Sequence, residues 1–282
     1  MESVNAISLE QAQALLAGRD LIAIGVRGDD ERRRRHGART TFVRVFEVHV
    51  DVIPQALPAS AAAGEVRVIG RPQSIEAAVD AVSRARTLAG DTPLTAFSLA
   101  DLVELAAGRL PEVLISLRKA GLEIIAEAPM DLLPDAAGVV RMAHQAGLMV
   151  PRLTVHAGSE HPADLIARAR ELQAMVGGIR AFAPLPRTSS IAHPSTGYDD
   201  VKLIATARLA ADNIDSIQVD WALYGPKLAQ VALTMGADDV DSVSPLQGDL
   251  GRRRSPIDEI RGNIEAAGLE AIERDGWFRV RV

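Results

Sequence analysis

Short hydrophobic runs of the kind that form buried strands alternate with stretches of helical periodicity along almost the whole chain. A helix is expected first, at about residues 8–17, because Ser8 and Gln11 stand at the spacing of a capping box. The strand-like runs that follow are Phe42–Asp51, Glu65–Arg71, Pro93–Ser98, Leu122–Pro129, Val150–Gly158, Ile179–Leu185, Ser216–Trp221 and Ala237–Val243. The helical stretches between them are Ser74–Ala89, Ser98–Ala120 in two pieces, Asp135–Ala146, Pro162–Met175, Tyr198–Asn213, Gly225–Met235 and Pro256–Ala267.

This alternation predicts an α/β fold, a (β/α)8 barrel of the TIM type, in preference to a doubly wound sheet. We expect one barrel domain over residues 1–282, with the N-terminal helix at one end and an extension over about 245–282 at the other. The first βα unit is predicted to be shortened. Only residues 52–64, which include Pro54 and Pro58, separate its two strand-like runs, and this is short for a crossover helix.

Polar residues recur on one face of several runs, and this face is expected to point into the barrel because helices must cover the apolar face. The recurring sets are Glu47, His49 and Asp51; Arg67 and Arg71; Glu123 and Glu127; Arg152, Thr154 and His156; and Ser216, Gln218 and Asp220. Two interpretations remain open. The lumen is wet or filled by a ligand, or its charges compensate one another, for example Arg67 and Arg71 against Glu47 and Asp51.

Composition narrows the possible partners. Hydrophobic residues make up 48% of the chain, enough for one large core, and a formal net charge of −6 argues against nucleic acid or an anionic membrane. No signal peptide and no run of membrane-spanning length is present, so we expect a cytoplasmic protein. The charge cluster Glu31–Arg35 is expected to be a solvated helix or loop, with a local anion site as the alternative. The chain has no cysteine, which excludes disulfides, thiolate nucleophiles and iron–sulfur clusters held by cysteine.

Segments of the second half carry a family resemblance. They are GGIRAFAPLPR (Gly177–Arg187), TGYDDVKLIATARL (Thr196–Leu209), DWALYGPKLAQVALTMGADDVDSV (Asp220–Val243) and the final EIRGNIEAAGLEAIERDGWF. Together they resemble the radical S-adenosylmethionine (radical SAM) family of aminofutalosine synthase, dehypoxanthine futalosine cyclase and the deazaflavin-cofactor synthases. The first two enzymes belong to the futalosine route to menaquinone. The resemblance extends over roughly residues 20–282.

The resemblance implies a four-iron four-sulfur cluster held by a CxxxCxxC loop after the first strand, and this chain lacks all three cysteines. The missing cysteines and the shortened unit fall at the same place. We therefore expect a degenerate member with no iron–sulfur cluster and no radical chemistry. Binding of S-adenosylmethionine is in doubt as well, because Arg71 replaces the second glycine of the family's Gly-Gly strand end.

Candidate site residues are expected at the carboxyl ends of the strands, where barrel enzymes carry their active sites. Acid–base catalysis would fall to His156, Glu127 and Asp220. Arg71, Arg152 and Arg187 suit a phosphate or carboxylate, because guanidinium groups bind such anions in a fork geometry. The full set of predicted ligand-binding residues is His49, Asp51, Gly70, Arg71, Arg152, Arg187, Thr188 and Trp221, of which Trp221 could pack on a flat ring.

No metal site is predicted, because the sixth strand has Pro184 where metal-dependent barrel hydrolases usually place a histidine. The leading hypothesis is a cluster-free homologue of the futalosine-pathway enzymes that binds a small anionic or nucleoside-like ligand, or a menaquinone-pathway enzyme as a partner. One alternative is a non-radical lyase or hydrolase that uses lumen acids and bases or a divalent metal. Another is a non-catalytic subunit that pairs with an intact radical SAM enzyme. The oligomeric state stays open.

Overall fold

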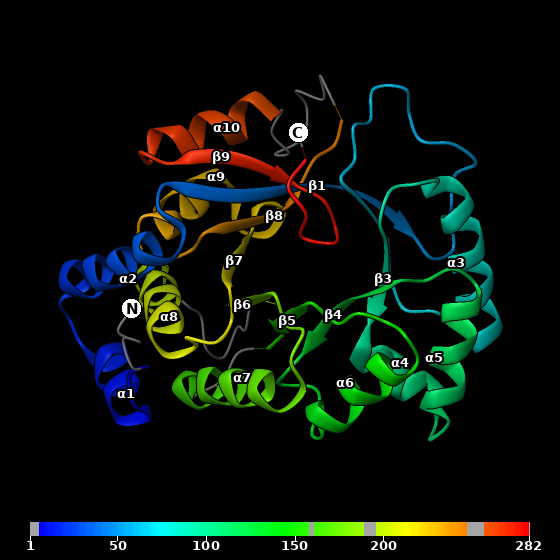
Figure 1. The fold of residues 1–282 in the computed structure, drawn as a ribbon, viewed down its shortest axis with the longest axis horizontal. Helices are drawn as coiled ribbons and strands as arrows, with labels where there is room; N and C mark the ends of the chain where they lie inside the picture. The colour runs from blue at the N-terminus through cyan, green and yellow to red at the C-terminus, as the bar shows by residue number, and fades with distance from the viewer. Residues whose placement is uncertain (1–5, 158–160, 189–195, 247–256, 282) are drawn as a thin grey trace.

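The computed structural model describes residues 6–157, 161–188, 196–246 and 257–281. In this part of the chain the strands are β1 (Arg39–His49), β2 (Glu65–Ile69), β3 (Leu94–Ser98), β4 (Ile124–Pro129), β5 (Arg152–Val155), β6 (Ala181–Pro186), β7 (Ser216–Asp220), β8 (Asp239–Val243) and β9 (Glu270–Arg274). The helices are α1 (Leu9–Ala17), α2 (Leu21–His36), α3 (Ile75–Ala89), α4 (Leu99–Ala106), α5 (Leu110–Lys119), α6 (Ala136–Gln145), α7 (Pro162–Val176), α8 (Gly197–Ala210), α9 (Trp221–Leu233) and α10 (Ile257–Ala266). Figure 1 shows the strands enclosed by the helices.

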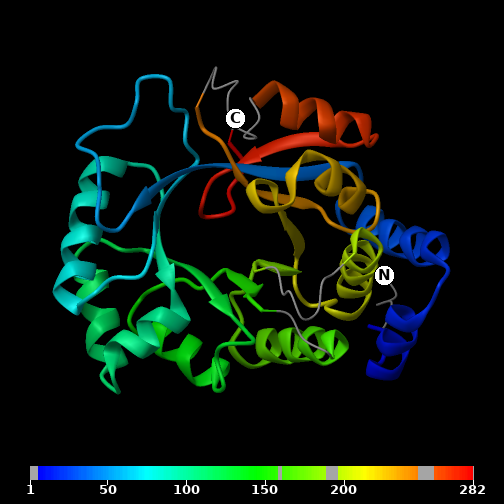
Figure 2. The same cartoon turned by 180° about the vertical axis from the view of Figure 1, so that it is seen from behind.

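The predicted barrel is confirmed, since β1 to β8 pair in sequence order and all of these pairs are parallel. β1 closes the ring by pairing with β8 along one edge and with β2 along the other. Its 11 residues are long enough to accept a second neighbour on the β2 edge. Residues Arg39–Val43 pair with β9, and residues Val45–His49 pair with β2. Figures 1 and 2 both show β9 lying alongside β1.

The first βα unit is shortened, as predicted. Residues 50–64 contain no helix and form an open loop between β1 and β2 (Figure 1). Ala61 touches Leu246 in an isolated bridge, so the loop is fastened to the segment that follows β8. The carboxyl-terminal turn also contacts this connection, because the amide of Gly276 donates to the carbonyl of Gly64 at 3.0 Å. β9 and this turn therefore lie beside the unit that has lost its helix.

The amino-terminal region contains the predicted helix α1 and, where the sequence left helix and loop open, the helix α2. Ser8 and Gln11 form the expected capping box at the start of α1. α2 packs against α8, and the expectation that Glu31–Arg35 is solvated was wrong for part of the cluster. Arg32 is fully buried, because its guanidinium reaches Asp29 and the carbonyl of Gly37 on the inner face of α2.

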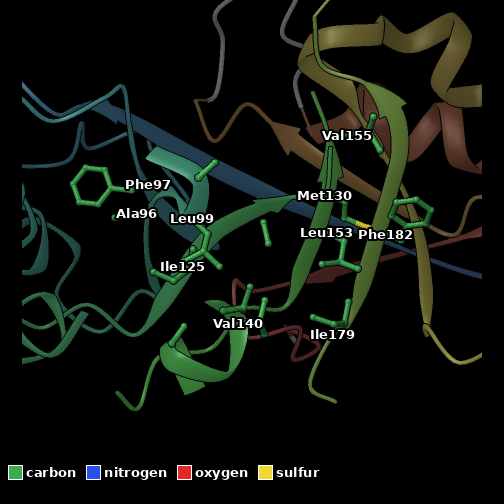
Figure 3. Close-up of a cluster of buried hydrophobic side chains, with 14 of the residues drawn as sticks. Ala96, Phe97, Leu99, Ile125, Met130, Val140, Leu153, Val155, Ile179 and Phe182 are labelled. Carbon is green, nitrogen blue, oxygen red and sulfur yellow. The ribbon is translucent and has the colours of Figure 1, made fainter. Parts of the chain in front are cut away.

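Apolar side chains fill the space between the outer faces of the strands and the helices. Leu153 of β5 lies opposite Phe182 of β6, and Figure 3 shows both beside Ile179. All three are at most 1% exposed. The polar faces of the same strands are thereby left to point inward.

Two predicted boundaries lie outside the described residues: Gly158 at the end of the fifth run and Pro256 at the start of the last predicted helix. The expected extension after about residue 245 contains α10 and β9 in its described part, and β9 is a member of the main sheet. None of the helices in the described ranges has the length and apolar character needed to span a membrane.

Candidate functional site

The middle of the lumen is occupied by four charged side chains that bind one another. Arg67 donates both terminal nitrogens to the Asp241 carboxylate, at 2.9 and 3.1 Å, and its Nε donates to Glu65 at 2.7 Å. Arg152 lies 3.4 Å from Asp241 and 3.6 Å from Glu65. All four are at most 5% exposed. The lumen charges are thus compensated, and the ion-pair partners of Arg67 are Glu65 and Asp241, whereas the sequence had suggested Glu47 and Asp51 as an example.

The acids of this cluster are held in their ionised form. Burial raises the pKa of Glu65, but the charges of Arg67 and Arg152 outweigh it and hold that pKa below its ordinary value. The pKa of Asp241 is also lowered, because Arg152 and Arg67 together outweigh its burial. A second layer lies nearer the amino ends of the strands, where Arg274 of β9 binds both oxygens of Asp239 at 2.6 and 2.7 Å. These two layers plug the barrel below its carboxyl end.

Above the plug lies a cavity of about 180 Å³ at the carboxyl ends of β1 to β6. Its charged lining comprises Glu47, Arg67, Arg71, Asp101, Glu127, Arg152 and Arg187. Gly70, Phe97 and Ser98 complete much of the wall. The cavity is therefore polar, and arginine supplies each of the cations that line it.

Four ionisable groups are linked in a chain at one side of this cavity, and two of them, Glu127 and Arg187, line its wall. Glu127 accepts a hydrogen bond from His156 Nε2 at 2.8 Å, and Arg187 lies 3.4 Å from the same carboxylate. Arg187 also donates to Asp220 at 3.0 Å, while the other oxygen of Asp220 caps the start of α9 at Leu223. Asp220 thereby fixes the guanidinium through a carboxylate that the fold itself holds in place.

Proton positions in this chain follow from the contacts. The hydrogen bond to Glu127 raises the pKa of His156 above its ordinary value, although burial opposes the shift. Burial raises the pKa of Glu127, but the His156 hydrogen bond and the charge of Arg187 prevail and bring it to about 2. Both shifts favour the ion pair of a Glu127 carboxylate with a protonated His156 imidazole.

The structure brings together five of the predicted residues as the wall of the cavity: Gly70, Arg71, Glu127, Arg152 and Arg187. His156 and Asp220 lie one contact behind it, through Glu127 and Arg187. Arg71 is 58% exposed and its partner is Glu104 on α4. Gly70 has a φ of +89°, a region that favours glycine, and an added Cβ there would lie 2.7 Å from His49 Nε2.

Four predicted residues lie elsewhere. His49 and Asp51 are 53% and 59% exposed on the outer rim, because β1 ends at His49 and the chain turns away. The Thr188 hydroxyl donates to the carbonyl of His156 at 2.7 Å and steadies that loop. Trp221 is fully buried in the hydrophobic core, so no face of its ring is open to the cavity.

Sequence reasoning missed two features of the wall. Phe97, at the end of β3, has a φ of +59°, which is unusual for a bulky side chain and turns the strand directly into α4. Asp101 in the first turn of α4 also lines the cavity, and burial raises its pKa although Arg71 acts against this. The position of Asp101, three residues after the strand-end Ser98, was the available indication.

The residues present do not fit the iron–sulfur cluster that the resemblance implies. The chain has no cysteine, and residues 50–64 supply neither the ligand loop nor the helix that would follow it. Within the described ranges, no group of three or more His, Asp or Glu side chains could hold a metal ion. Neither a protein-held cluster nor a step through one is compatible with these side chains.

Comparison with known proteins agrees with the sequence resemblance. Residues 182–274 match the family described as the CofH/MqnC C-terminal region. Aminodeoxyfutalosine synthase of Streptomyces coelicolor is 33% identical over 171 residues, which cover 52% of this chain and 44% of the relative. The same enzyme of Thermus thermophilus is 31% identical, with coverage of 62% and 56%. The chain is homologous to the futalosine and deazaflavin group of radical SAM enzymes.

A longer match extends the relationship to the rest of the chain. The 5-amino-6-(D-ribitylamino)uracil–L-tyrosine 4-hydroxyphenyl transferase of Methanothermobacter thermautotrophicus is 26% identical and covers 97% of this chain and 94% of its own. That alignment runs over 344 positions, so the relative carries segments that this 282-residue homologue lacks. The matches to the first relatives span only about half of their length, 44% and 55% for the first two.

Solved structures show the same fold. Methylornithine synthase superimposes with a TM-score of 0.67 over 95% of both chains, at 15% identity. HydG, a hydrogenase maturase, gives a TM-score of 0.64 over 95% of this homologue and 73% of its own chain, also at 15% identity. At this level of identity the likeness concerns the barrel alone.

Proposed function

We propose that this homologue binds a small anionic molecule in the cavity above the charge plug and does so without radical chemistry. The observation that carries the proposal is the position of Arg187. Its guanidinium lines the cavity at 22% side-chain exposure and is held from behind by Asp220 at 3.0 Å. A guanidinium anchored in this way presents its remaining donors at little entropic cost.

The chemistry of the wall favours a small anion. Arg71 stands at the mouth, and its exposed pair with Glu104 can open at little cost, since such pairs contribute at most about 1 kcal/mol. The cavity acids do not preclude an anion, because three acids face four arginines in the lining, and one of these acids, Glu127, is already bound to His156 and Arg187. Burial raises the pKa of Asp101, which also lessens the negative charge of the wall.

The size of the cavity favours a carboxylate over a nucleoside. Sites for drug-sized ligands are typically about 300–1,000 Å³, whereas this cavity has about 180 Å³. A dicarboxylate of four carbons fits this description of size and charge. The lack of cysteine ligands supports the proposal that no radical chemistry takes place, because the family's reaction depends on the cluster.

Binding is tested by calorimetry with succinate, phosphate and adenosine, and with succinamide as the uncharged counterpart of succinate. We expect saturable binding of succinate, weaker binding of phosphate and none of the two neutral molecules. Arg187→Gln should weaken succinate binding by about tenfold or more, because it removes a charge-assisted hydrogen bond. Arg170→Gln is the matched control, since Arg170 forms an exposed ion pair with Asp212 away from the cavity. Equal losses in the two variants, or equal binding of succinamide, would contradict the proposal.

The proposed absence of radical chemistry is tested by incubating the protein under anaerobic conditions with iron, sulfide, a strong reductant and S-adenosylmethionine. We expect no cluster absorption band that follows the folded protein and no 5′-deoxyadenosine. The Thermus aminodeoxyfutalosine synthase serves as the positive control for the reconstitution. Formation of 5′-deoxyadenosine by this chain above the protein-free blank would overturn the cluster-free interpretation.

A second candidate function, a non-radical lyase or hydrolase, rests on the His156–Glu127 pair at 2.8 Å beside the cavity. A protonated histidine can donate its proton to a leaving group, and Glu127 would hold the imidazole in orientation. A carboxylate that binds to the protein is incubated with it and followed by NMR for conversion. His156→Gln should abolish conversion and leave binding within about threefold, whereas an unchanged rate would exclude this role.

A further inference from the structure

A second cavity lies at the opposite end of the barrel. It has about 200 Å³ and is lined by the amino ends of β1, β6, β7 and β8 and by the turn that follows β9. The two charge layers of the lumen separate it from the upper cavity, because Arg274 and Asp239 fill the barrel between them. The lower cavity is thus an independent site.

One cation in this cavity has a charge that the described residues leave uncompensated. Arg39 is exposed at the first position of β1, and in the described ranges it has no ion-pair partner. The two acids of the wall are already engaged: Asp215 pairs with Arg180 at 3.1 Å, and Asp238 binds Arg208. Arg39 therefore supplies a free guanidinium beside carboxylates that already have partners.

The turn after β9 adds an apolar wall. Phe278 has a φ of +62°, a conformation that suits glycine and is unusual for a bulky side chain. Asp275 holds this turn by accepting hydrogen bonds from the amides of Trp277 and Arg279 at 2.8 and 2.9 Å. The Phe278 ring lies 3.9 Å from the Arg274 guanidinium, and Ile272 and Val280 lie on the same wall. A bulky ring thus occupies a strained position that lines a cavity, a pattern that points to a use for the ring.

We propose that this lower cavity binds a small organic acid, with its carboxylate on Arg39 and its aromatic or aliphatic body against Phe278 and Val280. A free cation and an apolar wall in one cavity match the two ends of such a molecule. Inorganic phosphate would use only the first, and a neutral ring only the second. The proposal does not depend on any ligand of the upper cavity.

The two tryptophans of the chain report the two ends separately. Trp277 adjoins Phe278 in the lower turn, and Trp221 is buried next to Asp220 at the upper end. In ¹⁵N-labelled protein, titrated benzoate should shift the indole signal of Trp277 in a saturable way and leave that of Trp221 in place. Trp277→Phe assigns the signals. Benzamide and inorganic phosphate at the same concentrations should bind at least about tenfold more weakly, because each lacks one of the two contacts.

Two variants and one control test the contacts. Arg39→Gln should weaken benzoate binding by about tenfold. Phe278→Gly should weaken it too while leaving the fold intact, because glycine adopts the left-handed conformation without strain. Arg141→Gln, at an exposed arginine of α6 without a partner in the described residues, should change nothing. The proposal is overturned if benzoate shifts the signal of Trp221 and not that of Trp277, or shifts neither signal. It is also overturned if phosphate or benzamide binds as tightly as benzoate, or if Arg39→Gln binds benzoate as tightly as Arg141→Gln does.

Discussion

The lumen of this barrel and its carboxyl-terminal rim are both rich in arginine, and Arg67 and Arg71, four positions apart in the chain, show how different the two regions are. Arg67, on β2, is 5% exposed and bound to two buried carboxylates. Arg71, just past the end of β2, is 58% exposed and pairs with an equally exposed Glu104. The side-chain exposure of Arg187, 22%, is intermediate between these two values. Lumen charges are paired with one another away from water, whereas the ion pairs of the rim remain in contact with it.

This difference follows from desolvation. A buried arginine that lost its carboxylates would remain charged and dry, so each lumen pair is hard to break once formed. At the rim water replaces a lost partner, and the same kind of pair contributes little. The interior of the barrel can therefore stay the same while the side chains at its carboxyl end change.

The largest expected effect is from Arg67→Met. The guanidinium lies 2.7 Å from Glu65 and 2.9 Å from Asp241, so its removal leaves two buried carboxylates beside an apolar side chain, with Arg152 as their remaining ion-pair partner among the described residues. We expect the free energy of unfolding to fall by about 3–5 kcal/mol. Urea denaturation followed by circular dichroism measures it. A loss below about 1 kcal/mol would mean that the lumen network does not stabilise the fold.

Arg187→Gln should have an intermediate effect on stability. The guanidinium bridges Asp220 and Glu127 at 3.0 and 3.4 Å, but its side chain is partly accessible to water. We expect a loss of about 1.5–3 kcal/mol in the same denaturation experiment. A loss as large as that of Arg67→Met would mean that Arg187 stabilises the fold as much as a lumen arginine does. Stability contributions would then not decrease from the lumen to the rim.

His156→Gln should have an effect that depends on pH. The pKa of His156 is raised from 6.5 in the folded protein, so its protonated form stabilises the fold. This contribution is fully present below pH 6.5 and is lost as the pH rises through the raised pKa. The unfolding midpoints of the two proteins should therefore differ most in acid and converge in alkali. A difference that grows with pH would show that the Glu127 contact does not favour the imidazolium.

The smallest expected effect is from Arg71→Gln. Both partners of its ion pair are more than half exposed, so the free energy of unfolding should change by at most about 1 kcal/mol. Denaturation in low and high salt checks this, because screening removes what remains of such a pair. A cost close to that of Arg67→Met would abolish the distinction between lumen and rim.

Much of the barrel could be predicted from local patterns. The strand-like runs and helical stretches correspond to β1 to β8 and α3 to α10, and the short segment 52–64 predicted the missing helix. β9 was missed because Glu270–Arg274 alternates too briefly to stand out, and it forms a strand only because Arg39–Val43 offers it a free edge. α2 was left undecided between a solvated helix and a loop because of its dense charges, although its glycines pack closely on α8 and on the turn at Met235.

The candidate site shows the same division. The positions of Glu127, Arg152 and Arg187 were predictable, because each lies in or directly after an apolar strand whose side chains alternate between the helices and the lumen. Trp221 and Asp51 were placed by the same rule but lie elsewhere, because each falls where its strand has already ended and the next segment sets the direction of the side chain. Phe97 follows no periodic rule, since a single left-handed residue turns the end of β3.

The sequence by itself determined the barrel, the family relationship and the absence of cluster ligands, because each depends on residue type and on spacing along the chain. Only the tertiary structure decided which charged side chains are buried in ion pairs and which are exposed to water. Arg67 meets Asp241 across 174 positions of the chain, through the closure of the barrel between β8 and β1. Such contacts depend on register, on burial and on which strand ends meet. That is why an arginine of the lumen and one of the rim look alike in the sequence and differ in the folded protein.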